Sequence, residues 1–271
     1  MSTTAAKALS LLDHFTEEEP EFGLSELARR AQGHKASVHR LLGALVDAGL
    51  IEQNTQTRRY RLGSGLLRLA QIREATSPIA SIVHQSLDRL MAETGETAHG
   101  SVISGNALAT IGIRESTRST RVSLVTGEVL PLHSTASGMV VLATGSEELT
   151  ARILAAPLAR RTIFTITDPE ELGDKIATVR AQGYAVSEEE NEDDVFGIAA
   201  PFFDSSGLSY GALAVAAPCH RMSDALRAQI IIALAREAKA VTQAIGGHMP
   251  PAHAAALRRT LKTLQDPQAK A

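Results

Sequence analysis

HKASVHRLLGALVDAGLIEQNTQTRRYRLG, residues 34–63, joins a helical pattern to a basic hairpin. Apolar side chains recur every three or four positions from about residue 35 to residue 48, which predicts a helix with one buried face. Gly49 follows directly, in the position after a helix that favours a left-handed residue. The stretch therefore predicts both a helix and its end.

The outer face of this helix is almost bare. On a wheel of about 100° per residue, five side chains form one apolar stripe: Val38, Leu41, Leu42, Leu45 and Val46. Arg40 lies nearly opposite the stripe, among residues with small side chains: Ala36, Gly43 and Ala44. A solvated face normally carries Lys, Glu and Gln. This bare face would instead let the helix backbone approach a large flat partner, with one guanidinium in front.

A second, shorter helix is predicted just before it, over LSELARRAQ (24–32), with a tight turn between the two. Two such helices are typical of a helix-turn-helix whose second helix enters the major groove of DNA. Two short strands at 50–53 and 59–62 then predict a hairpin wing. We expect base contacts from the helix and phosphate or minor-groove contacts from the wing, made respectively by Lys35, Ser37, His39 and Arg40, and by Arg58 and Arg59.

Positive charge is concentrated in this region, although the formal net charge of the chain is −3. Residues 29–73 contain nine Lys and Arg but two Asp and Glu, so this window carries +7 and the rest of the chain −10. A basic island on an acidic protein indicates one local polyanionic partner. Charge alone leaves two alternatives open: chance clustering on solvated faces, and a protein-interaction domain whose arginines form salt bridges.

The amino-acid composition limits which classes of protein this chain can belong to. A chain of 271 residues with 44% hydrophobic residues suits two domains, each with its own core. The single cysteine, Cys219, excludes an internal disulfide framework and fits a reducing compartment. No apolar run reaches the roughly 18 residues that a membrane span needs, and the N-terminal segment has no signal-peptide core. We therefore expect a cytoplasmic protein.

The second half predicts strands mixed with flanking helices, an α/β or α+β arrangement. Strands are expected at 97–104, 107–114 and near 121–125, with a hairpin over 196–217. Helices are expected over DPEELGDKIATVRAQG (168–183), which starts with Asp-Pro and stops at glycine, and over about 223–245. In the tail, apolar residues at 254, 257, 261 and 264 give a weak helical signature. Such a tail would either pack on a neighbouring subunit or trail.

The whole chain resembles the IclR family of bacterial transcriptional regulators. The segments that carry the resemblance are LSELARRA (24–31), SVHRLLGALVDAGLIE (37–52), RRYRLGSGLLRLA (58–70), LPLHSTASGMVVLA (130–143), RAQGYAVSEEE (180–190), GIAAPFFDSSG (197–207) and GALAVAAP (211–218). The resemblance implies a winged helix-turn-helix over 1–63, a linker helix over 64–77, a GAF-like α/β effector-binding domain over 78–248 and a tail over 249–271. It also implies a homodimer or a tetramer on a palindromic DNA operator.

The segment HSTASGMVVLA (133–143) predicts an anion site. Thr135 is placed to cap a helix whose first N–H groups and dipole favour a carboxylate. By resemblance, this first turn lines the effector pocket, and its expected contacts are Ala136, Ser137, Gly138 and Met139. The alternative is an ordinary helix start that packs against the sheet.

Four further positions depart from the family members that bind small oxo-acids. Those members tend to carry an aspartate, a cysteine and two serines where this chain has Ser187, Gly197, Ala214 and Ala216. The two alanines share one strand face, because side chains alternate along a strand. Apolar walls suit larger ligands. We therefore expect an effector larger or more hydrophobic than glyoxylate or pyruvate, a carboxylate with an apolar or aromatic body.

No motif indicates catalysis, a metal or a cofactor. The acidic run SEEENEDD (187–194) has adjacent carboxylates without metal-ligand spacing, so a solvated loop is expected. His99, His133 and His220 form no recognised ligand pattern. The sequence predicts a DNA-binding regulator that senses a metabolite, not an enzyme. The alternative is a metabolite-binding or enzymatic α/β protein whose N-terminal domain mediates protein contacts.

Overall fold

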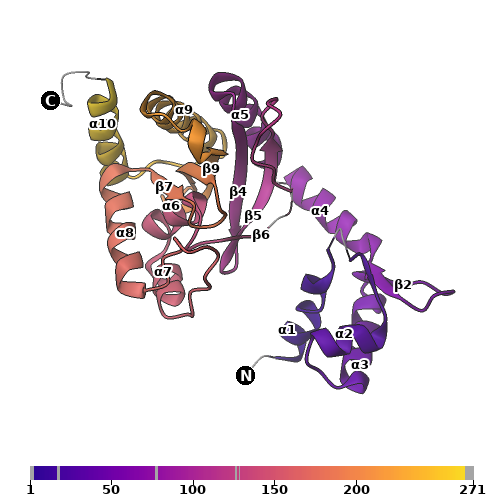
Figure 1. The fold of residues 1–271 in the computed structure, drawn as a ribbon. Helices are drawn as coiled ribbons and strands as arrows, with labels where there is room; N and C mark the ends of the chain where they lie inside the picture. The colour runs from indigo at the N-terminus through magenta and orange to yellow at the C-terminus, as the bar shows by residue number, and fades with distance from the viewer. Residues whose placement is uncertain (1–2, 17–18, 77–78, 126, 128, 266–271) are drawn as a thin grey trace. The chain divides into compact units, whose positions relative to one another are not determined.

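The computed structural model describes residues 3–16, 19–76, 79–125, 127 and 129–265. The chain forms two compact units, Met1–Pro78 and Ile79–Ala271 (Figure 1). Among the described residues, no helix is long and apolar enough to cross a membrane.

The first unit packs short helices on a small sheet. Its elements, in chain order, are α1 (Thr4–Leu9), the 3-10 turn η1 (Leu12–His14), β1 (Glu21–Phe22), α2 (Leu24–Arg30), α3 (Lys35–Asp47), β2 (Ile51–Gln53), β3 (Tyr60–Leu62) and α4 (Ser64–Thr76). The three strands pair antiparallel in the order β1-β3-β2. The sequence predicted the hairpin β2–β3 but missed β1, which lies directly before α2.

Helix α3 has the predicted extent and end. Val38, Leu42 and Leu45 are buried in the core of this unit. Gly49, with φ of +72°, supplies the left-handed residue that follows the helix. Val46 is 36% exposed, so the buried stripe is narrower than the wheel predicted.

The second unit is built on one antiparallel sheet of six strands in the order β6-β5-β4-β9-β8-β7. The strands are β4 (Thr97–Ser104), β5 (Ala107–Arg114), β6 (Val129–Pro131), β7 (Ala185–Glu188), β8 (Val195–Phe203) and β9 (Ser209–Pro218). The predicted strands at 97–104 and 107–114 and the hairpin β8–β9 are confirmed.

Helices cover both faces of this sheet (Figure 1). One face packs on α5 (Ile79–Thr94) and α9 (Asp224–Ala244), and the other on α6 (Ala136–Thr144), α7 (Glu147–Leu154) and α8 (Pro169–Gln182). Alternation along β9 shows the division: Leu213 and Val215 join the α5–α9 core, whereas Ala212 and Ala214 join the α6–α8 core.

The predicted strand near 121–125 is wrong. Residues 115–125, called the strap below, have no regular secondary structure. The free edge of β5 is taken by β6, so the strap cannot pair there. Its backbone is held by a side chain instead, because the hydroxyl of Thr97 donates to the carbonyl of Val122 over 2.7 Å.

The tail forms helix α10 (Pro251–Gln265), which packs against the C-terminal end of α8 and contacts α9 (Figure 1). His253, Ala256 and Leu257 are buried there, and the hydroxyl of Thr260 donates to the carbonyl of Gln182 over 2.8 Å. Described residues of the tail thus pack on their own chain, an arrangement that neither sequence-based alternative contained.

Candidate functional site

The outer face of α3 is open and nearly free of large side chains. Its exposed residues include all four predicted base contacts and three small residues: Lys35, Ser37, His39 and Arg40, with Ala36, Gly43 and Ala44. A Cβ built on Gly43 would have nothing within 4 Å. A flat partner could therefore reach the helix backbone beside Arg40.

The two wing arginines have different surroundings. Arg58 lies in the turn with φ of +59° and is exposed, and its carbonyl accepts a hydrogen bond from the side chain of Gln53. Arg59 instead donates to the carbonyl of Glu21 over 2.8 Å and pairs with Glu26 at 3.3 Å. Arg59 is held against its own domain because β1, which the sequence did not predict, lies beside β3. The wing arginines therefore differ, because Arg59 has partners within its own domain that the sequence did not predict.

Ion pairs also divide the rest of the basic island. Arg30 pairs with Glu19, and Arg61 pairs with Glu52 at 3.3 Å. Lys35, Arg40 and Arg58 make no ion pair with any residue that the structure describes. Lys35 and Arg40 of α3 and Arg58 of the wing tip are thus among the uncompensated cations of the island, and a polyanion could bind where they are exposed.

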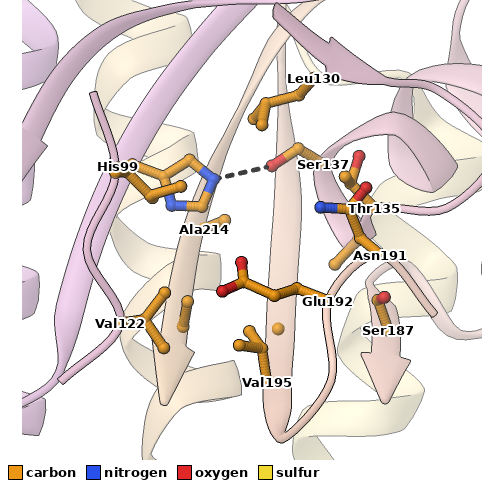
Figure 2. A pocket seen from close by; sticks show the side chains of 14 residues that line it. His99, Val122, Leu130, Thr135, Ser137, Ser187, Asn191, Glu192, Val195 and Ala214 are labelled. Carbon is orange, nitrogen blue, oxygen red and sulfur yellow. Dashed lines mark hydrogen bonds between the residues drawn. The ribbon is translucent and has the colours of Figure 1, made fainter. Parts of the chain in front are cut away.

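The second unit contains a cavity of about 60 Å³ between the sheet and the start of α6 (Figure 2). Its walls are formed by His99, Val122, Leu124, Leu130, Thr135, Ala136, Ser137, Ser187, Asn191, Glu192, Val195, Gly197, Ala214 and Ala216. This cavity is called the pocket below. None of these residues is Lys or Arg, so an anion would depend on neutral donors.

The N-terminus of α6 supplies such donors. Thr135 caps the helix as predicted, since its hydroxyl oxygen accepts from the N–H of Gly138 over 3.0 Å and donates to the carbonyl of Pro131 over 2.6 Å. The first two N–H groups of the helix, on Ala136 and Ser137, have no acceptor within the helix. They remain available to a ligand beside the Ser137 hydroxyl.

Gly138 and Met139, predicted as ligand contacts, do not line the pocket. The N–H of Gly138 is used by Thr135, and a Cβ on Gly138 would lie 2.3 Å from the carbonyl oxygen of Leu132. Met139 is fully buried in the core between α6 and α8. The helical turn directs only its first residues towards the pocket, which a sequence motif does not show.

The other six predicted effector contacts meet at the pocket, although they come from four elements: Ala136, Ser137, Ser187, Gly197, Ala214 and Ala216. Strand register explains part of this, because Ser187 lies opposite Gly197, and Gly197 lies opposite Ala216. The Ser187 hydroxyl is already used, since it donates to the carbonyl of Ser134 over 2.8 Å. This wall of the pocket is therefore mostly apolar.

His99 is a pocket residue that the sequence analysis missed. Its partner across the sheet is Ala214, and its Nε2 lies 3.5 Å from the Ser137 hydroxyl. Burial lowers the pKa of His99 to about 4, so its ring is neutral at pH 7. Nδ1 finds no hydrogen-bond partner among the described residues. The alternation of Thr97, His99 and Ser101 along one strand was the available signal.

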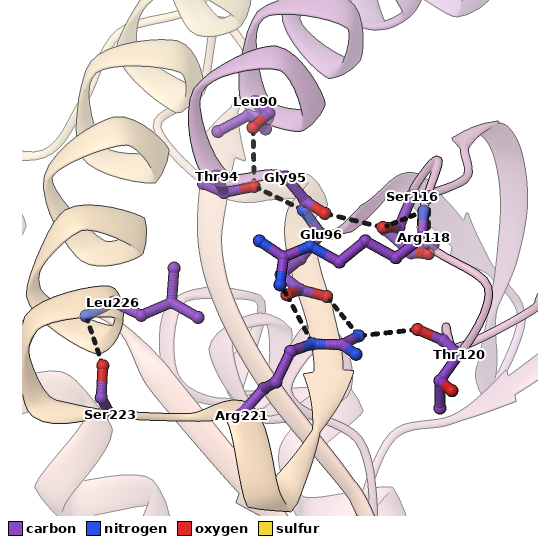
Figure 3. Close-up of polar contacts among 11 residues, drawn as sticks. Leu90, Thr94, Gly95, Glu96, Ser116, Arg118, Thr120, Arg221, Ser223 and Leu226 are labelled. Atoms are coloured by element: carbon purple, nitrogen blue, oxygen red, sulfur yellow. Dashed lines mark hydrogen bonds and ion pairs between the residues drawn. The ribbon is translucent and has the colours of Figure 1, made fainter.

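The strap closes one side of the pocket and is anchored by a buried ion pair (Figure 3). Arg221 donates to both carboxylate oxygens of Glu96, at 2.8 and 2.9 Å, and to the carbonyl of Thr120 at 2.9 Å. Arg118 approaches the same carboxylate to 3.7 Å. These contacts connect the strap to the start of β4 and the end of β9, and so fix a pocket wall.

The acidic run 187–194 is only partly a solvated loop. Glu190 is 9% exposed and pairs with Lys175 of α8. Burial raises the pKa of Glu190, an effect that the neighbouring Lys175 opposes. In the described part of the chain, no three His, Cys, Asp or Glu side chains are placed to hold a metal ion.

Two family models together match nearly the whole chain. The IclR helix-turn-helix domain matches residues 4–55, and the bacterial transcriptional regulator IclR C-terminal domain matches residues 74–267. The HTH-type transcriptional regulator BhcR of Paracoccus denitrificans is 32% identical over 203 residues, which cover 74% of this chain and 73% of that protein.

Solved structures agree with these matches. An IclR transcriptional regulator from Silicibacter sp. TM1040 has 42% sequence identity and a TM-score of 0.86, and the match covers 92% of this chain and 99% of that one. An IclR homologue from Microbacterium hydrocarbonoxydans, complexed with 4-hydroxybenzoate, shares the fold at 22% identity, with a TM-score of 0.73 over 90% of this chain and 99% of its own. The chain belongs to the IclR family of bacterial transcriptional regulators.

Proposed function

We propose that this regulator binds a palindromic operator as a homodimer or tetramer, with the outer face of α3 in the major groove. The observation that carries this proposal is the open surface around Arg40, where Gly43 leaves the helix backbone uncovered. Two α3 helices in successive major grooves, about 34 Å apart, would read the two halves of a palindrome. Since the operator lies on the chromosome, we place the protein in the cytoplasm.

Within this complex, the side chains of Arg40, His39, Ser37 and Lys35 contact base edges. Arg58 of the wing neutralises a phosphate or enters the minor groove. Arg59 supports the wing through Glu21 and Glu26.

The pocket binds a small carboxylate. The two free N–H groups of α6 and the Ser137 hydroxyl hold the acid group. Val122, Leu130 and Val195 contact the ligand body, so that body is apolar. The complex of the Microbacterium homologue with 4-hydroxybenzoate supports a carboxylate in this fold.

The size of the pocket limits the ligand body. The volume of about 60 Å³ is well below the roughly 150 Å³ of a cavity that holds benzene. A short acid fits within this volume, whereas an aromatic acid would extend beyond it. The ligand alters DNA affinity by binding one arrangement of the protein more tightly than another.

Binding to DNA from the chain's own genomic neighbourhood tests the first part. Affinity should fall steeply with salt, because neutralised phosphates release counterions. Arg40→Ala should lower the ratio of operator to random-DNA affinity about tenfold. Arg58→Ala should weaken both alike and reduce the salt slope by about one. Equal losses of specificity in the two variants would contradict the assigned roles.

A thermal-shift panel of acids tests the second part. Acids with apolar bodies should raise the melting temperature, since a ligand that binds only the folded state stabilises it. If only two- and three-carbon oxo-acids do so, the proposed ligand class is wrong. The alternative of an enzyme with a protein-binding head is set aside, because both halves match transcriptional regulators.

A further inference from the structure

The polar groups at one end of the pocket are all able to donate hydrogen bonds. The N–H groups and hydroxyl of Ser137 and its helix turn lie there. The Oδ1 atom of Asn191 accepts from the Ser134 hydroxyl over 2.9 Å, which leaves its amide NH2 group free to donate. Figure 2 shows this nitrogen directed towards the pocket. This donor end suits an anion.

A buried, incompletely bonded histidine adjoins the donor end. His99 is 7% exposed, and its Nδ1 has no hydrogen-bond partner within the described residues. Its other nitrogen makes one long contact, 3.5 Å, with the Ser137 hydroxyl. Because an unsatisfied buried polar atom is costly, this end is incomplete without a polar ligand group.

The pocket also carries an acceptor. Glu192, the residue after Asn191, lies on the loop between β7 and β8 and is exposed, and Figure 2 shows its carboxylate directed into the pocket, between His99 and Val195. No hydrogen bond or ion pair to Glu192 occurs in the part of the chain that the structure describes. An ionised carboxylate can only accept hydrogen bonds.

We propose that the effector carries a hydroxyl or ammonium group at the end opposite its acid group, and that Glu192 selects for this donor. The inference rests on the proposed function of the pocket as a carboxylate site. It adds a second recognition point, at the other side of an apolar body.

Charge and desolvation make Glu192 selective in both directions. A ligand donor gains a charge-assisted hydrogen bond to the carboxylate. A plain acid of the same size places an apolar group beside the carboxylate and displaces water from its pocket side without compensation. An acid bound in reverse would place two carboxylates together. Glu192 therefore fixes the orientation of the ligand as well as its chemistry.

Matched acids separate these contributions in calorimetric titrations of the full-length protein. The short series is butyrate, γ-hydroxybutyrate and γ-aminobutyrate, and the ring series is benzoate, para-hydroxybenzoate and para-aminomethylbenzoate. Within at least one series, the donor-bearing acids should bind roughly tenfold more tightly than the plain acid. Glu192→Gln should remove most of the preference for the ammonium compound and leave the plain acid unchanged or tighter.

Two further variants make the outcomes distinct. Asp193→Asn removes a neighbouring charge that does not line the pocket, so it should leave the preference intact. Ser137→Ala should weaken every acid roughly tenfold. If Ser137→Ala does so but plain and donor-bearing acids bind equally, or Glu192→Gln changes nothing, the inference is overturned and the carboxylate site stands. If no acid binds, or Ser137→Ala has no effect, the proposed function fails and this inference with it.

Discussion

Arg221 donates two hydrogen bonds, at 2.8 and 2.9 Å, to the carboxylate of Glu96, which lies 125 positions earlier in the chain. The Glu96 side chain has no exposed surface, whereas Arg221 is 18% exposed. The attraction offsets the cost of burying the charges only while both partners are present. This pair also holds the carbonyl of Thr120, and so the strap that forms a wall of the pocket.

Arg221→Met should therefore lower the unfolding free energy of the effector-binding domain by about 3 kcal/mol. Glu96 would remain buried, and its remaining charged partner would be the half-exposed Arg118 at 3.7 Å. Urea denaturation measures this loss. The control is Arg121→Met, which breaks the half-exposed pair with Glu115 and should cost less than about 1 kcal/mol. Losses of similar size in the two variants would show that burial does not set the strength of the Glu96 pair.

Gly138→Ala should lower the unfolding free energy by about 2 kcal/mol, because the new methyl group would lie 2.3 to 2.5 Å from backbone atoms of Leu132. The control is Gly173 of α8, where a Cβ would have nothing within 4 Å. Gly173→Ala should stabilise by about 0.5–1 kcal/mol, since alanine is the better helix former. Thermal or urea unfolding measures whether each variant is less or more stable than the wild type. Unchanged stability in Gly138→Ala would contradict the close packing of Gly138 against the backbone of Leu132.

Gly43→Gln should weaken DNA binding without disturbing the fold. The first atom of the added side chain meets no protein atom within 4 Å, but the side chain lies on the face of α3 that we propose to contact DNA. We expect at least a tenfold loss of affinity, because it holds the helix away from the base edges. Gly173→Gln makes the same change on the other unit and should leave binding intact. Wild-type affinity in the Gly43 variant would exclude this face as the contact.

The unfolding free energy should fall as the pH falls from about 6.5 towards 4. Burial lowers the pKa of His253 from its ordinary value of 6.5 to about 4, so the folded chain keeps this ring neutral while the unfolded chain takes up a proton. The contribution of His253 to the unfolding free energy is fully present above its unfolded-state pKa of 6.5 and is lost progressively as the pH falls below that value. At pH 5 the loss from this residue is about 2 kcal/mol.

His253→Phe isolates this contribution. A phenyl ring can keep the edge-to-face contact with Phe203, whose ring centroid lies 4.9 Å away, but it cannot titrate. Urea denaturation at pH 7 and pH 5 should give a smaller loss for the variant than for the wild type. His99 contributes in the same direction to both proteins, so it cancels in the comparison. Equal losses would contradict the assignment.

Much of the fold could be read from the sequence because its signals are local. Asp168 caps α8 by accepting from the N–H groups of Glu170 and Glu171, and Gly183 ends that helix with φ of +83°. Such caps act within a few residues. The bare face of α3 is equally local, since helical geometry alone places Arg40 opposite Leu42 and Leu45.

Two differences from the sequence-based expectations arise from contacts between distant segments. A strand was expected at 121–125, but the edge of β5 was taken by β6 and the carbonyl of Val122 by Thr97. Arg59 was expected to be free of its own domain, but β1 brings the carbonyl of Glu21 within reach of it. In each case the segment had the right local propensity, and a competing partner decided the outcome.

The sequence by itself determined the main helices, several of their ends and the bare face of α3, because these depend on the order and spacing of neighbouring residues. Tertiary structure alone decided the pocket. It brought His99 to Ser137, turned Glu192 inward and left Gly138 and Met139 in the core. A cavity is what several segments leave unfilled when they pack together, and that remainder is not a property of any one of them.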